Sequence, residues 1–132
     1  MTAPEAREQP YERGDSEQFT GEVWLRRGPT APGGNGMMVV HFSVGARTHW
    51  HMHPGGQFLF GLTGRGRVVP RGGKGHILLP GDIVYAPPGQ WHYHGAGPNS
   101  PMAHVAVYIG GSPEFGEPIE PVTDKEYDKD CY

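Results

Sequence analysis

Cysteine is nearly absent from this sequence of 132 residues, and the single one, Cys131, stands next to the C-terminus. One cysteine excludes a disulfide framework and a thiolate metal site. Charged residues make up only 19% of the chain, the net charge is −3, and no stretch concentrates Lys or Arg. This balance argues against nucleic acid and acidic membrane surfaces as partners.

Long apolar runs are missing as well. No run approaches the roughly 20 residues that a membrane-spanning helix needs. The polar start, MTAPEAREQPYERGDSEQ, lacks the apolar core of a signal peptide. We therefore expect a soluble, cytoplasmic protein that makes no contact with a membrane, and the length suits one domain with a single hydrophobic core.

Glycine and proline are abundant, with 22 and 14 residues, and they separate short apolar runs such as MMVVHF, QFLFGL and HVAVYI. Short strands with turn signals at this spacing predict an all-β sandwich or barrel. We expect a loose arm over residues 1–18, one barrel over 19–112 and an acidic tail over 113–132. Within the tail, Thr123 can cap one or two helical turns. The first strand is expected to run over residues 19–27.

Histidine is concentrated in the stretch GARTHWHMHPGGQ, where His49, His51 and His53 stand at alternate positions. Alternate residues of a strand point the same way, so we expect these three imidazoles to share one face. Together with Gln57, four residues further on, they would form half of a divalent metal site. The histidines that can supply the other half come later in the chain and are His92 and His94.

The same stretch resembles the first motif of the cupin superfamily, which is a glycine, a His-x-His pair, an acid and a second glycine at fixed spacings. The matching residues are Gly45, His51, His53, Gln57 and Gly64. The second cupin motif, a glycine followed by Pro-x-Gly and a histidine, is matched by Gly81, Pro87, Gly89 and His92. The resemblance implies a cupin double-stranded β-helix, also called a jelly-roll barrel, that is usually a homodimer. It also implies a metal ion bound by His51, His53, Gln57 and His92.

Gln57 stands where most cupins have a glutamate, so this set of side chains adds no negative charge to a bound metal. A divalent ion then keeps its full charge, which favours polarising a substrate oxygen over redox cycling. Neutral nitrogen and oxygen ligands suit Mn, Fe, Co, Ni or Zn, and the ligand set alone does not choose among them.

A closer resemblance is to the small bacterial cupins of the manganese type with hydroxynitrile lyase activity. The stretches that carry it are GARTHWHMHPGGQ, GDIVYAPPGQWHYHGAGP, MAHV and VTDKEY. It implies one divalent ion, Mn before Fe, Ni, Co or Zn, and a small-molecule substrate whose cyanohydrin bond is cleaved or formed. A histidine on the last barrel strand assists proton transfer in that group, and His104 matches it. His94, on the same face as His92, is a second candidate to contact the substrate.

Strand periodicity suggests which side chains form the wall of a substrate cavity. His104 and Tyr108 share one face of the last strand, and alternate residues of the strand over 37–44 would form the facing wall. Tyr108 and Met38 are bulkier than their counterparts in the lyases, which reshapes the substrate space. The candidate substrate-binding residues are Met38, Val40, Phe42, His49 and Tyr108.

Other interpretations remain open at this point. The chain can be a cupin dioxygenase or another oxidative tailoring enzyme that uses Fe or Mn with O₂, or a non-catalytic, metal-dependent binding module. His104 can equally be a buried histidine bonded to a neighbour, and Met38, Val40 and Phe42 can simply fill the barrel.

Overall fold

The computed structural model describes residue 1 and residues 10–129, and nearly all of its regular structure is β-strand. The strands are short and follow one another closely along the chain. Their bounds are β1 (Glu12–Arg13), β2 (Phe19–Thr20), β3 (Val23–Arg27), β4 (Gly36–Phe42), β5 (Arg47–Thr48), β6 (His51–Met52), β7 (Gln57–Gly64), β8 (Gly66–Pro70), β9 (His76–Leu78), β10 (Ile83–Ala86), β11 (His92–Ala96), β12 (Met102–Tyr108) and β13 (Glu114–Phe115). The helix α1 (Asp124–Asp128) follows near the C-terminus.

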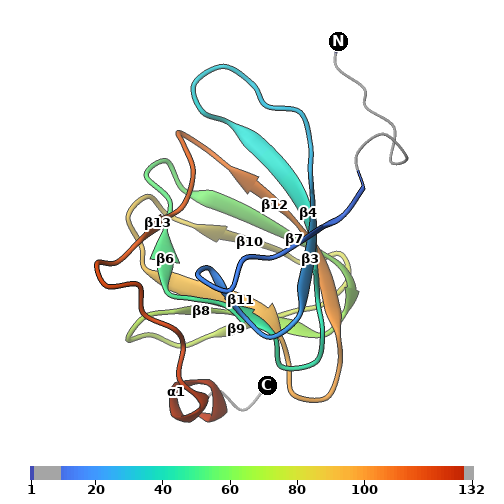
Figure 1. Cartoon of the computed structure of the whole chain (residues 1–132), viewed down its shortest axis with the longest axis vertical. Coiled ribbons are helices and arrows are strands. Elements are labelled where there is room, and N and C mark those ends of the chain that lie inside the picture. Colours follow the sequence, from blue (N-terminus) through green and yellow to red (C-terminus); the bar gives the residue numbers. More distant parts are fainter. Residues whose placement is uncertain (2–9, 130–132) are drawn as a thin grey trace.

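Two antiparallel sheets curl over each other and enclose the interior of the molecule (Figure 1). The first has the strand order β1-β3-β4-β12-β7-β10. The second has the order β13-β6-β11-β5-β2, with β8 paired to β11 and β9 paired to β8. This is the all-β, single-domain barrel that the sequence predicts, and it brings β6 and β11, which carry histidines, side by side.

Alternation along the strands decides what faces the interior. In β7, Gln57, Leu59 and Gly61 are buried, while Phe58 and Phe60 between them are exposed on the outer face. The interior is filled at one end by a cluster of buried apolar residues. The members of this cluster are Val23, Leu25, Val40, Phe42, Ala46, Leu59, Val68, Leu78, Ala96, Met102 and Ala106.

The predicted first strand, residues 19–27, is two strands in the structure. Gly21 lies between them with φ of +84°, a left-handed conformation that glycine adopts without a Cβ clash. The short strand β2 pairs with β5 in the second sheet, and β3 pairs with β4 in the first. Part of the expected N-terminal arm is also regular, because β1 pairs with β3. Residues 2–9 of that arm lie outside the described residues.

The histidine stretch is not one continuous strand, so the expectation that three imidazoles share a face is wrong for His49. Strand β5 ends at Thr48 and β6 begins at His51, with a bend at Trp50 between them. The backbone N–H of His49 donates to the carbonyl of Gln18 and that of Trp50 to the carbonyl of Glu120, both outside the ladder. The bend breaks the two-residue period and takes His49 away from His51.

The predicted helical turn in the tail is confirmed. The Thr123 side chain accepts a hydrogen bond from the backbone N–H of Glu126, and the Glu126 side chain accepts one from the N–H of Thr123. This reciprocal capping box satisfies two N–H groups at the start of α1. The helix then buries Tyr127 against the barrel.

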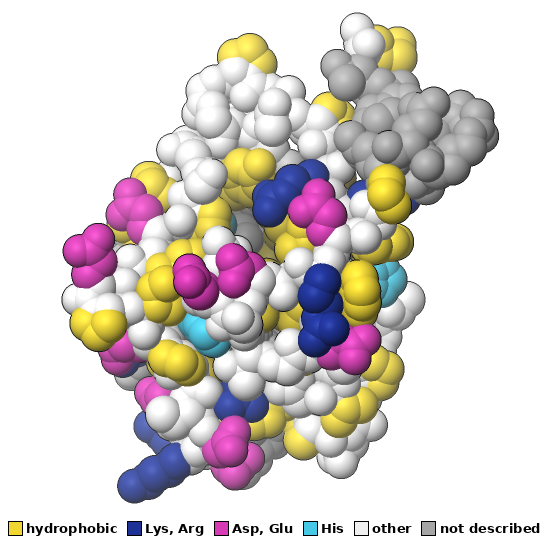
Figure 2. Space-filling model, in the orientation of Figure 1, with side chains coloured by type: hydrophobic (Ala, Val, Ile, Leu, Met, Phe, Trp, Pro, Cys, Tyr) yellow, Lys and Arg dark blue, Asp and Glu magenta, His cyan; other side chains and the backbone are white. Residues whose placement is uncertain are grey.

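Within the described residues, no helix is long and apolar enough to cross a membrane. On the face of the molecule shown in Figure 2, Lys and Arg side chains are interspersed with Asp and Glu side chains. Neither sign of charge forms a continuous field on that face.

Candidate metal centre

Three imidazoles converge inside the barrel at the point where β6 and β11 pair. His51 and His92 are direct partners across these two strands, and His53 is the first residue after the end of β6. The ligating atoms of the three side chains all lie within 4.8 Å of one another. Gln57, the first residue of β7, places its Oε1 3.1 Å from Nε2 of His92. All four side chains are buried.

Backbone carbonyls fix which ring nitrogen of two of these histidines carries its proton. Nδ1 of His51 donates to the carbonyl of His49 at 2.9 Å, and Nδ1 of His92 donates to the carbonyl of Gln90 at 2.9 Å. With the proton on Nδ1, each ring turns the lone pair of Nε2 toward the centre of the cluster. Histidines that bind metals in proteins almost always make this outer hydrogen bond.

Several nitrogen and oxygen atoms of the cluster lack a hydrogen-bond donor, and a bound cation would supply the missing partner. Neither ring nitrogen of His53 makes a hydrogen bond of good geometry within the described part of the chain, although both are buried. The Nε2 lone pair of His92 faces the amide oxygen of Gln57, so two acceptors meet there. The amide can relieve this contact by turning its NH₂ toward His92, or a cation can satisfy both atoms. The residues present therefore fit a divalent metal ion bound by three imidazoles and one amide oxygen.

Burial keeps these imidazoles neutral, which is the form that binds metals. Loss of hydration, together with the smaller effect of His92 beside it, lowers the pKa of His53 to about 4. The pKa of His51 is well below its ordinary value for the same reasons, and burial also lowers that of His92. Because a buried positive charge is costly, all three side chains are free bases at neutral pH.

A second pair of histidines lies beside this cluster. Nε2 of His104 is 2.9 Å from Nδ1 of His94, so one of the two rings donates a hydrogen bond to the other. Burial and the neighbouring imidazoles lower the pKa of His94 well below its ordinary value, and burial lowers that of His104 to about 4. The other nitrogens of the pair, Nε2 of His94 and Nδ1 of His104, have no hydrogen-bond partner among the described residues.

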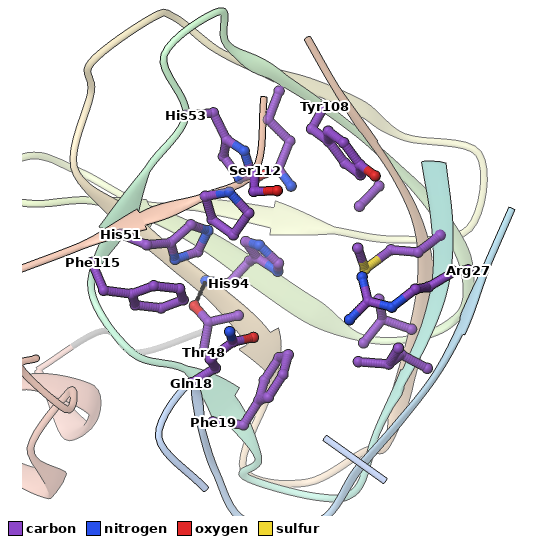
Figure 3. Close-up of a pocket in the computed structure, with 16 residues that line it drawn as sticks. Gln18, Phe19, Arg27, Thr48, His51, His53, His94, Tyr108, Ser112 and Phe115 are labelled. Carbon is purple, nitrogen blue, oxygen red and sulfur yellow. Dashed lines mark hydrogen bonds between the residues drawn. The ribbon is translucent and has the colours of Figure 1, made fainter. Parts of the chain in front are cut away.

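A cavity of about 210 Å³ opens onto the imidazoles (Figure 3). His94 borders the cavity, whereas His104 is fully buried behind it and is not part of its wall. Of the predicted substrate-binding residues, Met38, Val40 and Tyr108 line this space. Tyr108 stacks nearly parallel to His53 at 6.4 Å between ring centroids.

Two predicted substrate-binding residues are not part of the described cavity wall. Phe42 packs in the core instead, against His104 at 5.2 Å and His94 at 6.0 Å between ring centroids. His49 is held away from the cavity because both of its ring nitrogens make hydrogen bonds, Nδ1 with the Glu17 carbonyl and Nε2 with the Thr20 hydroxyl. The bend before β6 is the physical reason for the position of His49.

The cavity also has lining residues that sequence reasoning missed. Arg27 follows Val23 and Leu25 at the two-residue period of β3, so the pattern of inward residues points to it. Phe115 and Ser112 come from the C-terminal segment, whose return to β6 leaves no signal in the sequence. The missed residues of the wall are Gln18, Phe19, Leu25, Arg27, Thr48, Ala106, Ser112, Pro113 and Phe115.

Comparison with known proteins identifies the family of this chain. The family model described as "Cupin domain" matches residues 38–108, more than half of the chain. This chain belongs to the cupin family, and the resemblance carried by the two histidine motifs is confirmed. The barrel of two curled sheets with histidines inside it is therefore a cupin barrel.

Within the family, the chain is 37% identical over 119 residues to a protein of Granulicella tundricola named (R)-mandelonitrile lyase, covering 87% of this chain and 89% of the relative. It is also similar to a cupin-like protein of Thermotoga maritima, with a TM-score of 0.82 and 38% identity over 89% of this chain and 90% of the other. The polyketide cyclase RemF of Streptomyces resistomycificus shares the fold alone, with a TM-score of 0.70 and 17% identity over 97% and 91% of the two chains.

Proposed function

We propose that this cupin is a metal-dependent lyase that cleaves or forms cyanohydrins. The observation that carries the proposal is a neutral base, His94, at the wall of a small cavity beside three histidines and a glutamine that could hold a metal ion. The 37% identity with a protein named (R)-mandelonitrile lyase supports it. The preferred ion is Mn²⁺, and Fe, Ni, Co and Zn are the alternatives.

The four side chains of the cluster would bind the metal ion, and the neighbouring pair, His94 and His104, would carry out proton transfer. A divalent cation held by His51, His53, Gln57 and His92 would supply a Lewis acid for the oxygen of the substrate. Because all four ligands are neutral, the protein does not offset the charge of that cation.

His94 would act as the base that starts cleavage. Its Nε2 has no hydrogen-bond partner among the described residues, and its pKa is low, so it is unprotonated at neutral pH. Nε2 takes the proton of the substrate hydroxyl, the bond to the nitrile carbon breaks, and its electron pair leaves on cyanide. The imidazolium then returns the proton to cyanide, which gives hydrogen cyanide and an aldehyde.

His104 would position His94 without touching the substrate. The hydrogen bond between the two rings fixes the orientation of His94 and the nitrogen that it presents to the cavity. The resemblance to the lyases implies proton transfer by His104; we assign that role to His94 instead, because of the two residues only His94 borders the cavity. The walls from β4 and β12, including Met38 and Tyr108, would set which aldehyde fits.

The test is to load the purified protein with Mn²⁺, offer racemic mandelonitrile and measure benzaldehyde. We expect release above that of the metal-free protein, and a loss of about 100-fold or more in His94→Gln, the size of a general-base contribution. His76→Gln is the matched control, since His76 is exposed on β9 and is not part of the cavity wall. No benzaldehyde above the metal-free blank would contradict the proposal. Oxygen consumption with bound iron would instead favour the oxidative alternative.

A further inference from the structure

The cavity is charged at the end opposite the imidazoles. Arg27 is the last residue of β3 and shares a strand face with the buried residues Val23 and Leu25; it is itself exposed, and it lines the open part of the cavity. The two-residue period therefore carries a guanidinium into the mouth of the barrel, where an apolar side chain would continue the pattern. Figure 3 shows Arg27 reaching into the cavity from the side of the wall opposite His51 and His53.

Among the residues that the structure describes, no acidic side chain pairs with this cation. The lining residues include Arg27 and no Asp or Glu. Glu114 stands between the lining residues Pro113 and Phe115 but is not part of the wall. Within the described residues, the guanidinium of Arg27 makes no ion pair or hydrogen bond, whereas Arg47 and Arg71 are each paired with a carboxylate.

Uncharged polar groups surround the same space. Gln18, Ser112 and Tyr108 line the cavity, and none of their side chains makes a hydrogen bond within the described part of the chain. A small cavity with a few unpartnered polar groups aimed into it is the usual form of a site that orients a ligand. The charge of the wall is +1 from Arg27, and a divalent ion at the imidazole end would raise the total to +3.

We propose that the substrate of this enzyme is a small organic anion whose carboxylate is bound by Arg27 at the cavity mouth. This inference rests on the proposed lyase function and names its substrate class: a hydroxynitrile, or the aldehyde that forms it, with a carboxylate at the far end from the reacting carbon. Arg27 would bind the carboxylate through two parallel N–H donors. The small cavity would limit the substrate to a short or single-ring acid.

The experiment compares two aldehydes that differ only in the carboxylate, benzaldehyde and 4-formylbenzoate. Binding to the Mn²⁺-loaded protein is measured by calorimetry, and formation of each cyanohydrin from added cyanide is measured separately. We expect 4-formylbenzoate to bind about tenfold more tightly than benzaldehyde, the size of a charge-assisted hydrogen-bonded pair that is partly open to water.

The matched variants are Arg27→Gln and Arg26→Gln. Both remove one positive charge from β3, but Arg26 lies on the outer side of the strand, over the Tyr11 ring at 5.5 Å. We expect Arg27→Gln to abolish the preference for the carboxylate and Arg26→Gln to keep it, while Arg27→Lys keeps part of it because a lysine lacks the paired donors.

The outcomes separate this inference from the lyase proposal. If the carboxylate gives no preference, or if the preference survives in Arg27→Gln, Arg27 does not bind the anion and the inference is wrong, whatever the lyase activity. If the preference depends on Arg27 but neither cyanohydrin is formed, Arg27 does bind the anion, but the site serves a different reaction. The lyase proposal is then wrong.

Discussion

At the scale of single residues, this site depends on imidazoles that stay neutral because they are buried. Burial lowers the pKa of His104 to about 4, below the value of about 6.5 for an exposed histidine. Between these two values the unfolded chain binds a proton at this residue and the folded chain does not. Stability therefore falls as the pH falls through that range.

This difference predicts an acid-sensitive, metal-free protein. From pH 6.5 down to pH 4, His104 alone should remove about 3 kcal/mol from the free energy of unfolding. The measurement is urea unfolding of metal-free protein at a series of pH values. His104→Gln should reduce the pH dependence by about one proton in this range, whatever its own stability at pH 7. A pH dependence equal to that of the unchanged protein would show that His104 does not titrate between the two states.

At the scale of elements, helix α1 is joined to the barrel by two buried arginines. The guanidinium groups of Arg47 and Arg67 lie against the Tyr127 ring at 4.3 and 4.1 Å from its centroid. Arg67 also donates to the Tyr127 carbonyl at 2.8 Å, and the Tyr127 hydroxyl donates to the carbonyl of Ala96 at 2.6 Å. These contacts connect the tail to β11, the strand that carries His92 and His94.

Because α1 is only five residues long, its capping box should matter for its stability. Thr123→Ala removes the acceptor for the Glu126 N–H and should cost about 1 kcal/mol in the free energy of unfolding. Chemical denaturation measures this cost, and Thr30→Ala is the control, since Thr30 is exposed in a loop. Equal stability of the two variants would show that the cap does not hold the tail in place.

The arrangement of the strands also explains which parts of the site could be predicted from the sequence and which could not. The spacings of His51, His53, Gln57 and His92 predict a shared site because each stands at the beginning of a strand or beside one. The bend at Trp50 was not predictable, because hydrogen bonds of His49 and Trp50 to distant carbonyls produce it. The return of β13 to β6 depends on tertiary packing, so Phe115 and Ser112 carried no local signal.

At the scale of the whole molecule, the outer face of the first sheet is apolar across four strands. Two rows of paired residues run over β4, β12, β7 and β10, and the outer residues Phe58 and Phe60 are 41% and 39% exposed. An apolar surface that spans several strands marks an interaction site. The rows are Met37, Val107, Phe58 and Tyr85, and Val39, Val105, Phe60 and Ile83.

We expect this face to join two copies of the chain into a homodimer, because an apolar face repeated on both copies can cover itself about a two-fold axis. Light scattering coupled to size-exclusion chromatography measures the mass of the particle in solution. Phe60→Glu places a charge in the middle of the face and should give a monomer. Val44→Glu, at an exposed turn away from these rows, should leave the dimer intact. A monomer in the unchanged protein would contradict the expectation.

Metal content shows most directly whether the barrel binds one divalent ion through His51, His53, Gln57 and His92. The protein is purified, incubated with Mn²⁺, desalted and analysed by mass spectrometry for metals, beside His53→Ala and the exposed-site control His76→Ala. His53 makes no hydrogen bond of good geometry that the substitution would break among the described residues. The prediction is about one ion per chain in the unchanged protein and in His76→Ala, and a loss of about tenfold or more in His53→Ala. An unchanged protein that retains no ion, or a His53→Ala variant that retains as much, would contradict it.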